Sequence, residues 1–480
     1  MAAEWKEMPK PFFIAGKRVE SHMARDIVNP HTGGLVASVC KPRAEHLEDA
    51  LAAAAKGFQK TRGLRSHERS KICAAVAAGI SRRAGEFAKT IAAEAGKPLK
   101  HARAEVERSI STFTFAAEEA KRIGGEMIPL DVTPASGDRY GITKRVPSGA
   151  VFAITPFNFP LNLVAHKVGP ALACGCPIVV KPASRTPLAS LMLAEVVAES
   201  GAPEGAFSVV PCSAEVADAF VPDERLAVLS FTGSAAVGWN LKSRAGRKRV
   251  TLELGGNAAC VVDATADVDV AASRCAMGAF AYQGQVCISV QRILAHESVY
   301  GNFMKKFLKR IEGIRVGDPL DENTDFSAMI SEAEAVRIEE WVNEALNSGA
   351  RILCGGRRDG AVYYPTVLEN VPDEAKISCE EAFGPVAVVS PFGDFDDAIH
   401  AVNKSKYGLQ AGVFTNDLSH AQTAFDELEV GAVIINDAPT FRVDNMPYGG
   451  VKFSGFGREG VRHAIEEMTE LRLCVMTRDV

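Results

Sequence analysis

The sequence predicts an α/β protein built from two stacked α/β domains with no disordered linker between them. Three observations support this prediction. The N-terminal third has a helical pattern, short β-branched runs alternate with helical runs from about residue 149, and a second alternating series begins near residue 258. Such alternation is typical of a parallel sheet covered by helices. The length of 480 residues fits two or three units of about 150 residues each.

The N-terminal helices are indicated by apolar residues at helical spacing. The first of them is marked by Leu47, Leu51, Ala54 and Phe58. Two more helical runs are predicted over residues 71–93 and 102–122. The pair Gly124-Gly125 then ends the helical pattern.

The first alternating series has four strand-like runs, each followed by a helical run. The strands are expected at 151–154, 178–180, 207–210 and 227–231, and the helices at 160–173, 188–199, 215–219 and 234–243. The second series opens with a strand at 258–262 and a helix at 268–282, and it continues to about residue 434. A last strand is expected at 471–476. We therefore expect two parallel sheets.

Composition excludes several classes of protein. Lys and Arg total 54 and Asp and Glu total 59, so the net charge of −5 argues against a nucleic-acid-binding protein. The longest apolar runs fall short of about 18 residues, and the N-terminal MAAEWKEMPK has no apolar core, so neither a membrane span nor a secretory signal is expected. Eleven scattered cysteines are typical of reduced thiols in a cytoplasmic protein. No Cys/His spacing predicts a metal site.

Two glycine-rich stretches could bind a dinucleotide. Gly455, Gly457 and Gly460 match GxGxxG, but only 20 residues follow them, which is too few for a βαβ unit. We interpret this stretch as a loop before the last helix. At Gly233-Ser234 a strand-like run leads directly into a helical run. Gly233 would allow a tight turn, Ser234 would cap the helix, and the helix N-terminus could bind phosphate, although spacing alone is weak support.

Seven short motifs, taken together and in order, identify a family resemblance. They are Thr155-Pro-Phe-Asn-Phe-Pro, Val180-Lys-Pro-Ala-Ser, Phe231-Thr-Gly-Ser, Glu253-Leu-Gly-Gly-Asn, Gly284-Gln-Val-Cys, Glu380-Glu-Ala-Phe-Gly-Pro and Pro447-Tyr-Gly-Gly-Val-Lys. With them the chain resembles the NAD(P)-dependent aldehyde dehydrogenase superfamily from about residue 12 to its end. MPYGGVK and CISVQR resemble the lactaldehyde dehydrogenase-like branch, beside glyceraldehyde-3-phosphate and succinate-semialdehyde dehydrogenases.

The resemblance implies three catalytic residues. Cys287 would be the nucleophile, because a partly ionised thiolate attacks a carbonyl carbon well. Asn158 and the backbone N–H of Cys287 would stabilise the oxyanion, an effect of about 3 kcal/mol on the barrier for such a donor. Glu253 would activate water to hydrolyse the thioester. Without the resemblance, each could be an ordinary core or turn residue.

The resemblance also implies the cofactor contacts. Lys181 would bind the adenosine ribose, Glu381 the nicotinamide ribose and Phe383 the nicotinamide ring, while Gly233 and Ser234 would lie near the pyrophosphate. The remaining contacts would come from Thr155, Phe157 and Gly238. Strict NAD enzymes often carry Glu where this chain has Ser184, and Arg185 could pair with a 2′-phosphate or be solvated. NAD and NADP therefore stay equally open.

The substrate pocket follows from the same analogy. Its lining would include Leu163, His166, Val286, Ile288, Arg442 and Tyr448, with Arg108 as a second possible anchor. The positive charge of Arg442 predicts a short anionic or hydroxylated aldehyde, unless Arg442 is paired structurally, for instance to Asp444. His166 on an apolar helix is expected to be a packing residue rather than a general base.

The implied architecture has three parts. Residues 1–123 and 146–254 would form a Rossmann-like NAD(P)-binding domain, 255–435 the catalytic domain, and 124–145 with 466–480 a small β element for oligomerisation into homodimers or homotetramers. Two competing functions remain. The first is a CoA-acylating dehydrogenase, against which Glu253 argues because acylating members lack it. The second is a non-catalytic binding or structural homologue, which would be expected to have lost a catalytic residue.

Overall fold

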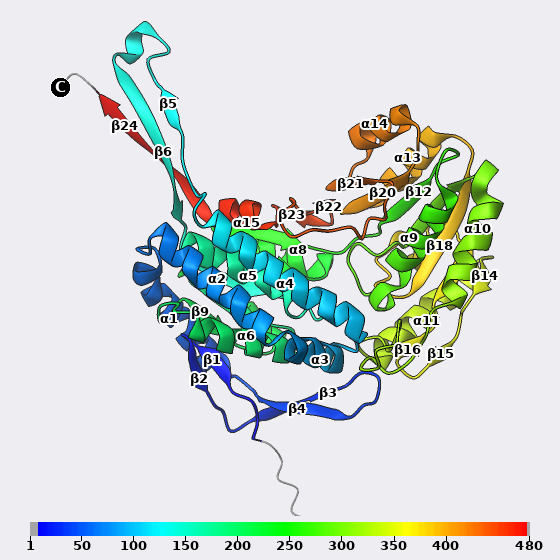
Figure 1. Cartoon of the computed structure of the whole chain (residues 1–480), viewed down its shortest axis with the longest axis horizontal. Coiled ribbons are helices and arrows are strands. Elements are labelled where there is room, and N and C mark those ends of the chain that lie inside the picture. The colour runs from blue at the N-terminus through cyan, green and yellow to red at the C-terminus, as the bar shows by residue number, and fades with distance from the viewer. Residues whose placement is uncertain (1–7, 478–480) are drawn as a thin grey trace, which may run out of the picture.

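The computed structural model describes residues 8–477, and its core is formed by two sheets in two adjoining lobes (Figure 1). The first sheet has the order β2-β1-β9-β8-β7-β10-β11-β23. Its strands are β1 (Phe12–Ile14), β2 (Lys17–Val19), β7 (Ala150–Ile154), β8 (Ile178–Lys181), β9 (Phe207–Val209), β10 (Leu226–Thr232), β11 (Arg249–Glu253) and β23 (Gly455–Phe456). The five central strands, from β9 to β11, are parallel, as the first alternating series predicts.

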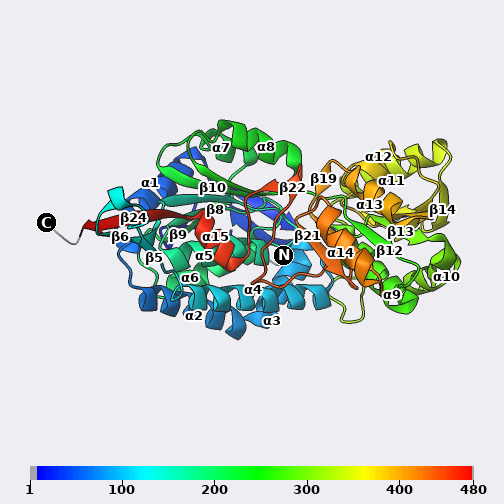
Figure 2. The same ribbon diagram turned by 90° about the horizontal axis from the view of Figure 1, so that it is seen from above.

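Helices cover both faces of this sheet (Figure 2). One face carries α2 (Ser66–Arg82), α3 (Ala84–Ala95), α4 (Leu99–Glu119), α5 (Asn162–Cys174) and α6 (Leu188–Glu199). The other carries α1 (Ala44–Thr61), α7 (Ala214–Ala219) and α8 (Ala235–Arg244). Side chains alternate along the strands, so Val151 and Ala153 face the first helix layer while Phe152 faces the second.

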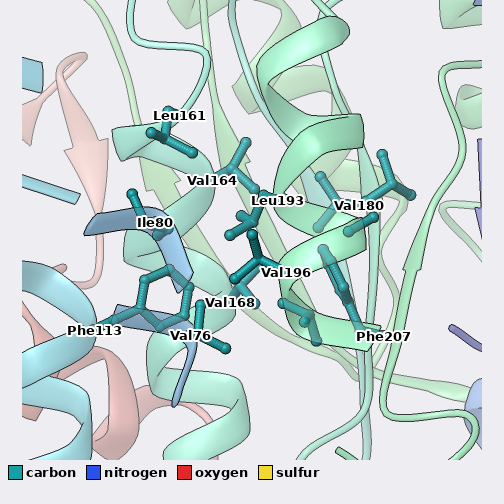
Figure 3. Packing of buried hydrophobic residues seen from close by; sticks show 14 of the residues in the cluster. Val76, Ile80, Phe113, Leu161, Val164, Val168, Val180, Leu193, Val196 and Phe207 are labelled. Carbon is teal, nitrogen blue, oxygen red and sulfur yellow. The ribbon is translucent and has the colours of Figure 1, made fainter. Parts of the chain in front are cut away.

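The core of the first lobe is a close fit between helices and sheet (Figure 3). Phe113 of α4 packs beside Val168 of α5, and Val196 of α6 lies on the sheet side of them. All three are at most 3% exposed. Burying such side chains contributes about 1.5–3 kcal/mol each, so α4 and α5 form a rigid support for the loops at the sheet's edge.

The second sheet is parallel except at one edge and has the order β14-β17-β18-β13-β12-β20-β21. Its strands are β12 (Ala259–Val262), β13 (Arg292–His296), β14 (Arg351–Cys354), β17 (Thr366–Glu369), β18 (Val386–Phe392), β20 (Gln410–Phe414) and β21 (Ala432–Ile435). Its helices are α9 (Val268–Phe280), α10 (Glu297–Glu312), α11 (Glu332–Asn347), α12 (Lys376–Cys379), α13 (Phe395–Asn403) and α14 (Leu418–Glu427). The two predicted series therefore form two separate sheets.

A three-stranded antiparallel arm projects from the first lobe (Figure 1). It is formed by β5 (Met127–Pro129), β6 (Arg139–Pro147) and β24 (Thr469–Thr477), with the turn η1 (Pro134–Ser136) at its tip. The predicted oligomerisation element falls on these strands. Its residues 478–480 lie outside the described part of the chain, and so do residues 1–7 of the predicted NAD(P)-binding domain. The remaining two-stranded pairs are β3 (Ala24–Val28) with β4 (Leu35–Cys40), β15 (Arg358–Asp359) with β16 (Val362–Tyr363), and β19 (Tyr407–Gly408) with β22 (Val451–Lys452).

Some local predictions were wrong. The single helical run expected over 71–93 is two helices, because Arg83 leaves helical geometry between α2 and α3 and its guanidinium pairs with Glu86 and Glu195. The strands β1 to β4 precede the first predicted helix and were not expected. The first sheet also takes in β23, where no strand was predicted. Of the glycines in this stretch, Gly455 lies in β23, and residues 457–460 form the predicted loop that leads into the last helix, α15 (Val461–Glu467).

None of the helices within residues 8–477 is long and apolar enough to cross a membrane. Among the same residues, no group of three or more His, Cys, Asp or Glu side chains could hold a metal ion.

Candidate active site

The predicted catalytic residues meet between the two sheets. Glu253 is the last residue of β11, and Asn158 follows β7 in the loop before α5. Both therefore lie at the carboxyl edge of the first parallel sheet, where α/β proteins commonly bind ligands. Cys287 comes from the other lobe, in the loop between the turn η2 (Ala281–Gly284) and β13. Loops from three distant segments of the sequence thus converge.

Close backbone approaches hold these loops together. A Cβ at Gly256 would lie 2.5 Å from the carbonyl oxygen of Cys287, and one at Gly255 would lie 2.0 Å from Oε2 of Glu381. The backbone contact at position 256 therefore requires glycine, whereas a side chain at position 255 would displace the Glu381 carboxylate. The two glycines of Glu253-Leu-Gly-Gly-Asn thereby let the end of β11 lie against the loop of Cys287.

Cys287 is half-buried, and its Sγ lies 2.9 Å from the hydroxyl of Tyr448. Burial raises the pKa of the Cys287 thiol to about 11, although the Tyr448 hydrogen bond and the charge of Arg442 act in the opposite direction. The expectation of a partly ionised thiolate near neutral pH therefore does not hold in this state. The thiol is protonated there, and a base must remove its proton before it can attack a carbonyl.

Asn158 is buried beside the nucleophile loop. Its Nδ2 donates a hydrogen bond to the carbonyl oxygen of Gln285, 3.0 Å away and two residues before Cys287. One N–H of the amide is used in this bond, and the other stays available as a donor. The buried Oδ1 of Asn158 has no hydrogen-bond partner among the described residues. The amide is thus fixed against the loop that carries the thiol.

Glu253 is a buried carboxylate, and neither of its oxygens has a hydrogen-bond partner within residues 8–477. Burial and the nearby charge of Glu459 raise the pKa of Glu253 well above its ordinary value. Glu459 in turn accepts a hydrogen bond of 2.7 Å from Lys167 Nζ, which also donates to Ser230 Oγ at 2.8 Å. A carboxyl group with a raised pKa and free oxygens has the properties of a general base working near neutral pH.

Arg442 is a buried guanidinium that stacks on an aromatic ring. Its carbon Cζ lies 3.5 Å from the centroid of the Tyr448 ring, and Nη2 is 3.6 Å from Oε2 of Glu459. The side chain is 6% exposed, and its Nε and Nη2 have no hydrogen-bond partner in the described part of the chain. These donors are an unusual feature, because buried guanidinium N–H groups are normally satisfied.

Asp444 pairs with Arg108 and His166, not with Arg442. Its Oδ1 is 2.7 Å from Arg108 Nη2 and 2.8 Å from His166 Nε2. The structural pairing considered from the sequence is therefore present with other partners, because Arg442 pairs with Glu459 and Arg108 pairs with Asp444. Burial alone would raise the pKa of Asp444, but the His166 hydrogen bond and the charges of His166 and Arg108 hold it well below its usual range. His166 is fully enclosed, in agreement with a packing role.

The other predicted lining residues surround the thiol or lie on α5. Ile288 and Tyr448 form a small buried cluster with Leu409, against which Val286 and Cys287 pack. Leu163 is buried on α5, one turn before His166. The wall next to Cys287 is thus apolar apart from the Tyr448 hydroxyl and the Arg442 guanidinium.

A cleft of about 760 Å³ opens at the carboxyl ends of β7, β8 and β10. Thr155, Lys181, Gly233 and Ser234 line it, together with apolar side chains of α8. The buried hydroxyls of Thr155 and Thr232 have no hydrogen-bond partner among residues 8–477. An apolar wall, two free hydroxyls and an ammonium group fit a dinucleotide, which has a flat base and several polar oxygens.

Three details of the cleft differ from expectation. Ser234 occupies the N-cap position of α8, but its side chain makes no capping hydrogen bond. Gly233 does not have a positive φ, and it is required for another reason, since a Cβ there would lie 2.5 Å from the Phe231 ring. Gly238 faces the core instead of the cleft, where a Cβ would meet Leu254 Cδ2 at 2.4 Å.

Ser184 and Arg185 lie in the loop that follows β8, and neither lines the cleft as it stands. Arg185 is exposed, and no carboxylate among residues 8–477 forms an ion pair with it. Glu381 accepts a hydrogen bond from the Gly256 N–H at 3.2 Å, and burial raises its pKa to about 7. The rings of Phe157 and Phe383 meet edge to face, with centroids 5.8 Å apart. These last residues lie at the junction of the two lobes.

Residues 18–474 match the model of the aldehyde dehydrogenase family. The chain belongs to this family. Among its relatives, a 3-sulfolactaldehyde dehydrogenase of Priestia aryabhattai is 45% identical over 465 residues, which is 97% of each chain. The solved structure of aldehyde dehydrogenase 21 from Physcomitrella patens, in complex with succinate, has a TM-score of 0.96 at 45% identity, covering 98% of this chain and 99% of that one.

A second solved structure concerns the cofactor. The glyceraldehyde-3-phosphate dehydrogenase of Methanocaldococcus jannaschii, complexed with NADP, has a TM-score of 0.91 at 39% identity, covering 95% of this chain and 100% of that one. The predicted fold and enzyme class are thus confirmed. Aldehyde dehydrogenases use NAD or NADP, and this chain is an NAD(P)-dependent oxidoreductase acting on an aldehyde.

Sequence reasoning missed several residues of this aldehyde dehydrogenase site. They are Lys167, Glu459, Gln285 in its contact with Asn158, and the pairing role of Asp444. One signal was available for Lys167, because a lysine in the otherwise buried and apolar α5 needs a partner. Glu459 lies inside the GxGxxG match. Because that match was rejected as a dinucleotide-binding loop, its glutamate was not considered as a site residue.

Proposed function

We propose that this aldehyde dehydrogenase oxidises a short aldehyde, with an anionic or hydroxylated far end, to the carboxylic acid. The observation that carries the proposal is Arg442, a buried guanidinium beside the thiol cluster whose Nε and Nη2 have no hydrogen-bond partner among the described residues. A ligand carboxylate, sulfonate or phosphate would satisfy those donors. The names of the relatives support the same view, because 3-sulfolactaldehyde, succinate and glyceraldehyde 3-phosphate all carry an anionic group.

In the proposed reaction, Cys287 Sγ forms a bond to the aldehyde carbon. The thiol proton leaves to solvent as this bond forms, and the Tyr448 hydrogen bond and the charge of Arg442 favour the thiolate. The negative oxygen that develops on the former carbonyl is stabilised by Asn158 Nδ2 and the Cys287 backbone N–H. When bound, NAD or NADP supplies the hydride acceptor. The product on the enzyme is a thioester of Cys287.

Hydrolysis of the thioester needs an activated water molecule. Glu253 serves as its base, since a carboxyl group with a raised pKa accepts a proton more readily than an ordinary one. Water then attacks the thioester carbon, the C–S bond breaks, and the acid leaves as Cys287 recovers its proton. A CoA-acylating reaction is the alternative, and Glu253 supports hydrolysis over it.

The residues proposed to hold the cofactor come from both lobes. Thr155, Lys181, Gly233 and Ser234 would bind the adenosine and diphosphate part in the cleft, as their position there supports. Glu381, with Phe383 and Phe157, would bind the nicotinamide end. We propose that NADP is accepted as well as NAD, because position 184 has no carboxylate to repel a 2′-phosphate and Arg185 is exposed.

We also propose assembly through the arm, as a homodimer or homotetramer. The arm exposes large apolar side chains that a single chain leaves in water, among them Met127 at 73%, Leu471 at 60% and Leu473 at 51%. Large apolar side chains exposed on a projecting arm are typical of an interface. All eleven cysteines are free thiols, which supports a reducing, cytoplasmic setting.

The test of the proposed function is an aldehyde panel with purified protein. Lactaldehyde, glycolaldehyde, succinate semialdehyde, glyceraldehyde 3-phosphate and phosphonoacetaldehyde are each assayed with NAD and with NADP. We expect the anionic aldehydes to give the highest kcat/KM and the product to be the free acid. Acyl-CoA formed in the presence of CoA would instead establish the acylating alternative.

A further inference from the structure

The buried ammonium group of Lys97 lies between two aromatic rings from the two catalytic loops. Its Nζ is 3.7 Å from the ring centroid of Phe159 and 4.3 Å from that of Tyr282. Phe159 directly follows Asn158, and Tyr282 lies in the η2 turn that leads to Cys287. The Lys97 side chain is 0% exposed. One cation thus contacts both the loop of the predicted oxyanion donor and the loop of the predicted nucleophile.

The partner of Lys97 extends this connection. Glu105 on α4 accepts a hydrogen bond of 2.5 Å from Lys97 Nζ on its Oε2. Its Oε1 accepts hydrogen bonds from the backbone N–H groups of Leu161 and Asn162, at 2.9 and 3.1 Å. These groups are at the start of α5, immediately after the Asn158 loop. The ion pair therefore binds that loop by a ring contact and by its backbone.

The segment next to Lys97 also binds the nucleophile loop. The Tyr282 hydroxyl donates to the carbonyl oxygen of Ala95 at 3.1 Å, and Gln283 Nε2 donates to that of Gly96 at 3.2 Å. Tyr282 and Gln283 have φ values of 48° and 55°. Non-glycine residues rarely adopt this left-handed region, and they do so where surrounding contacts impose it. Residues 95–97 supply such contacts.

We propose that Lys97, together with Glu105, is a positioning residue that sets the Asn158 loop against the Cys287 loop. This inference rests on the proposed roles of Asn158 and Cys287. Stability alone is a poor reason for the pair, because an apolar pair of similar size is often at least as stable as a buried ion pair. The contacts with two aromatic ring faces give a reason for a charged group at position 97. A desolvated cation attracts these faces and orients both rings, which an apolar side chain would not do.

The experiment compares Lys97→Met, Lys97→Arg and the double variant Lys97→Met/Glu105→Gln. The double variant removes both charges, yet the amide oxygen introduced at position 105 can still accept from the Leu161 and Asn162 N–H groups. We expect it to melt near the temperature of the wild type. Its first-turnover rate of NAD(P)H formation should nevertheless fall by about 100-fold, as a misplacement of about 1 Å can produce. The Kd for NADP should change little, and Lys97→Arg should recover part of the rate.

Glu94→Gln is the matched control. Glu94 is a buried carboxylate on α3 whose oxygens accept hydrogen bonds from the Leu188 and Ala189 N–H groups at the start of α6, and among the described residues it forms no hydrogen bond with the Asn158 or Cys287 loop. We expect this variant to lose stability while keeping its first-turnover rate. A wild-type first-turnover rate in the double variant would overturn the positioning role. A structural role would replace it if Glu94→Gln, with a similar loss in melting temperature, lost as much of its first-turnover rate as the double variant.

Separate variants test the positioning role of Lys97 and the catalytic role of Cys287. Cys287→Ala tests the proposed function, because retained aldehyde oxidation in that variant would overturn the role of the thiol. A fully active double variant, measured beside an inactive Cys287→Ala, would overturn only the role of Lys97. Where Lys97→Met fails to fold, the double variant and Lys97→Arg give the same comparison.

Discussion

The Sγ of Cys287 and the hydroxyl of Tyr448 lie 2.9 Å apart, within hydrogen-bond distance. The thiol pKa is raised by burial, and the Tyr448 hydrogen bond is the first influence that lowers it. Tyr448 is itself enclosed, with Arg442 stacked on its ring. The phenol therefore connects the sulfur of the proposed nucleophile to the Arg442 guanidinium, because it contacts both.

Replacing Tyr448 by Phe should make Cys287 harder to ionise. A hydrogen bond to a charged group contributes about 1.5–3 kcal/mol, which corresponds to one to two pKa units. We expect the pH dependence of iodoacetamide alkylation of Cys287 to move to higher pH by about that amount. Tyr300→Phe is the control, because it removes a phenol that contacts Glu369 on the second sheet. An unchanged alkylation profile would mean that the contact has no effect on the thiolate.

Glu253→Gln should separate the two half-reactions. If Glu253 is the base for water, the variant should accumulate the thioester and show kcat reduced by about 100-fold or more. The wild-type rate should rise with pH through the raised pKa of Glu253, because the carboxyl group must lose its proton to act as a base. The variant should lose this ascending limb. Mass spectrometry of the acyl-enzyme checks the prediction, and absence of any acyl adduct would contradict it.

Arg185→Ala should affect NADP more than NAD. Arg185 is exposed without an ion-pair partner among residues 8–477, and a 2′-phosphate would give it one. We expect KM for NADP to rise by about tenfold and KM for NAD to change less than about twofold, as an interaction of about 1.4 kcal/mol implies. Arg62→Ala, directly after the end of α1, is the control. Equal changes for both cofactors would show that Arg185 is merely solvated.

Asp444→Asn should lower the free energy of unfolding near pH 7 by about 1.5–3 kcal/mol, the range for a hydrogen bond to a charged group. The pKa of Asp444 is lower in the folded chain than in an unfolded one, where it is about 3.9. Its stabilisation is therefore complete above about pH 5 and is lost as the pH falls below about 4. Urea titrations of both proteins should show a difference that shrinks in acid. A difference independent of pH between about 3 and 7 would contradict the assignment.

Sequence reasoning located four central strands of the first sheet with their helices, and the first strand and helix of the second, because each has a clear period. Phe152 and Val151 alternate between faces, and α6 begins and ends at the predicted residues, Leu188 and Glu199. Arg83 shows where this fails. The helical pattern continues across it, and only its ion pairs with Glu86 and Glu195 indicate the break between α2 and α3.

The sequence could predict those residues of the site that lie in the family's motifs. Cys287, Glu253 and Asn158 lie together because strand ends meet at a sheet edge, which topology determines. Glu459 could not be assigned to the site, because its place depends on a loop that returns from the far end of the chain to Lys167. The unsatisfied donors of Arg442 could not be predicted from the sequence either. They depend on Asp444 forming its hydrogen bond with Arg108 and not with Arg442.

The central claim, an anionic aldehyde anchored by Arg442, is tested most directly by one ratio. The kcat/KM for succinate semialdehyde is divided by that for butanal, in the wild type, Arg442→Leu and Arg108→Leu. Because Arg442 Nε and Nη2 have no hydrogen-bond partner among the described residues, the wild-type ratio should be large, and Arg442→Leu should reduce it by about 10–100-fold, the effect of a charged hydrogen bond of about 1.5–3 kcal/mol. Arg108→Leu should reduce it less, because Asp444 already pairs with Arg108. An equal loss of kcat/KM for both aldehydes in Arg442→Leu would contradict the account.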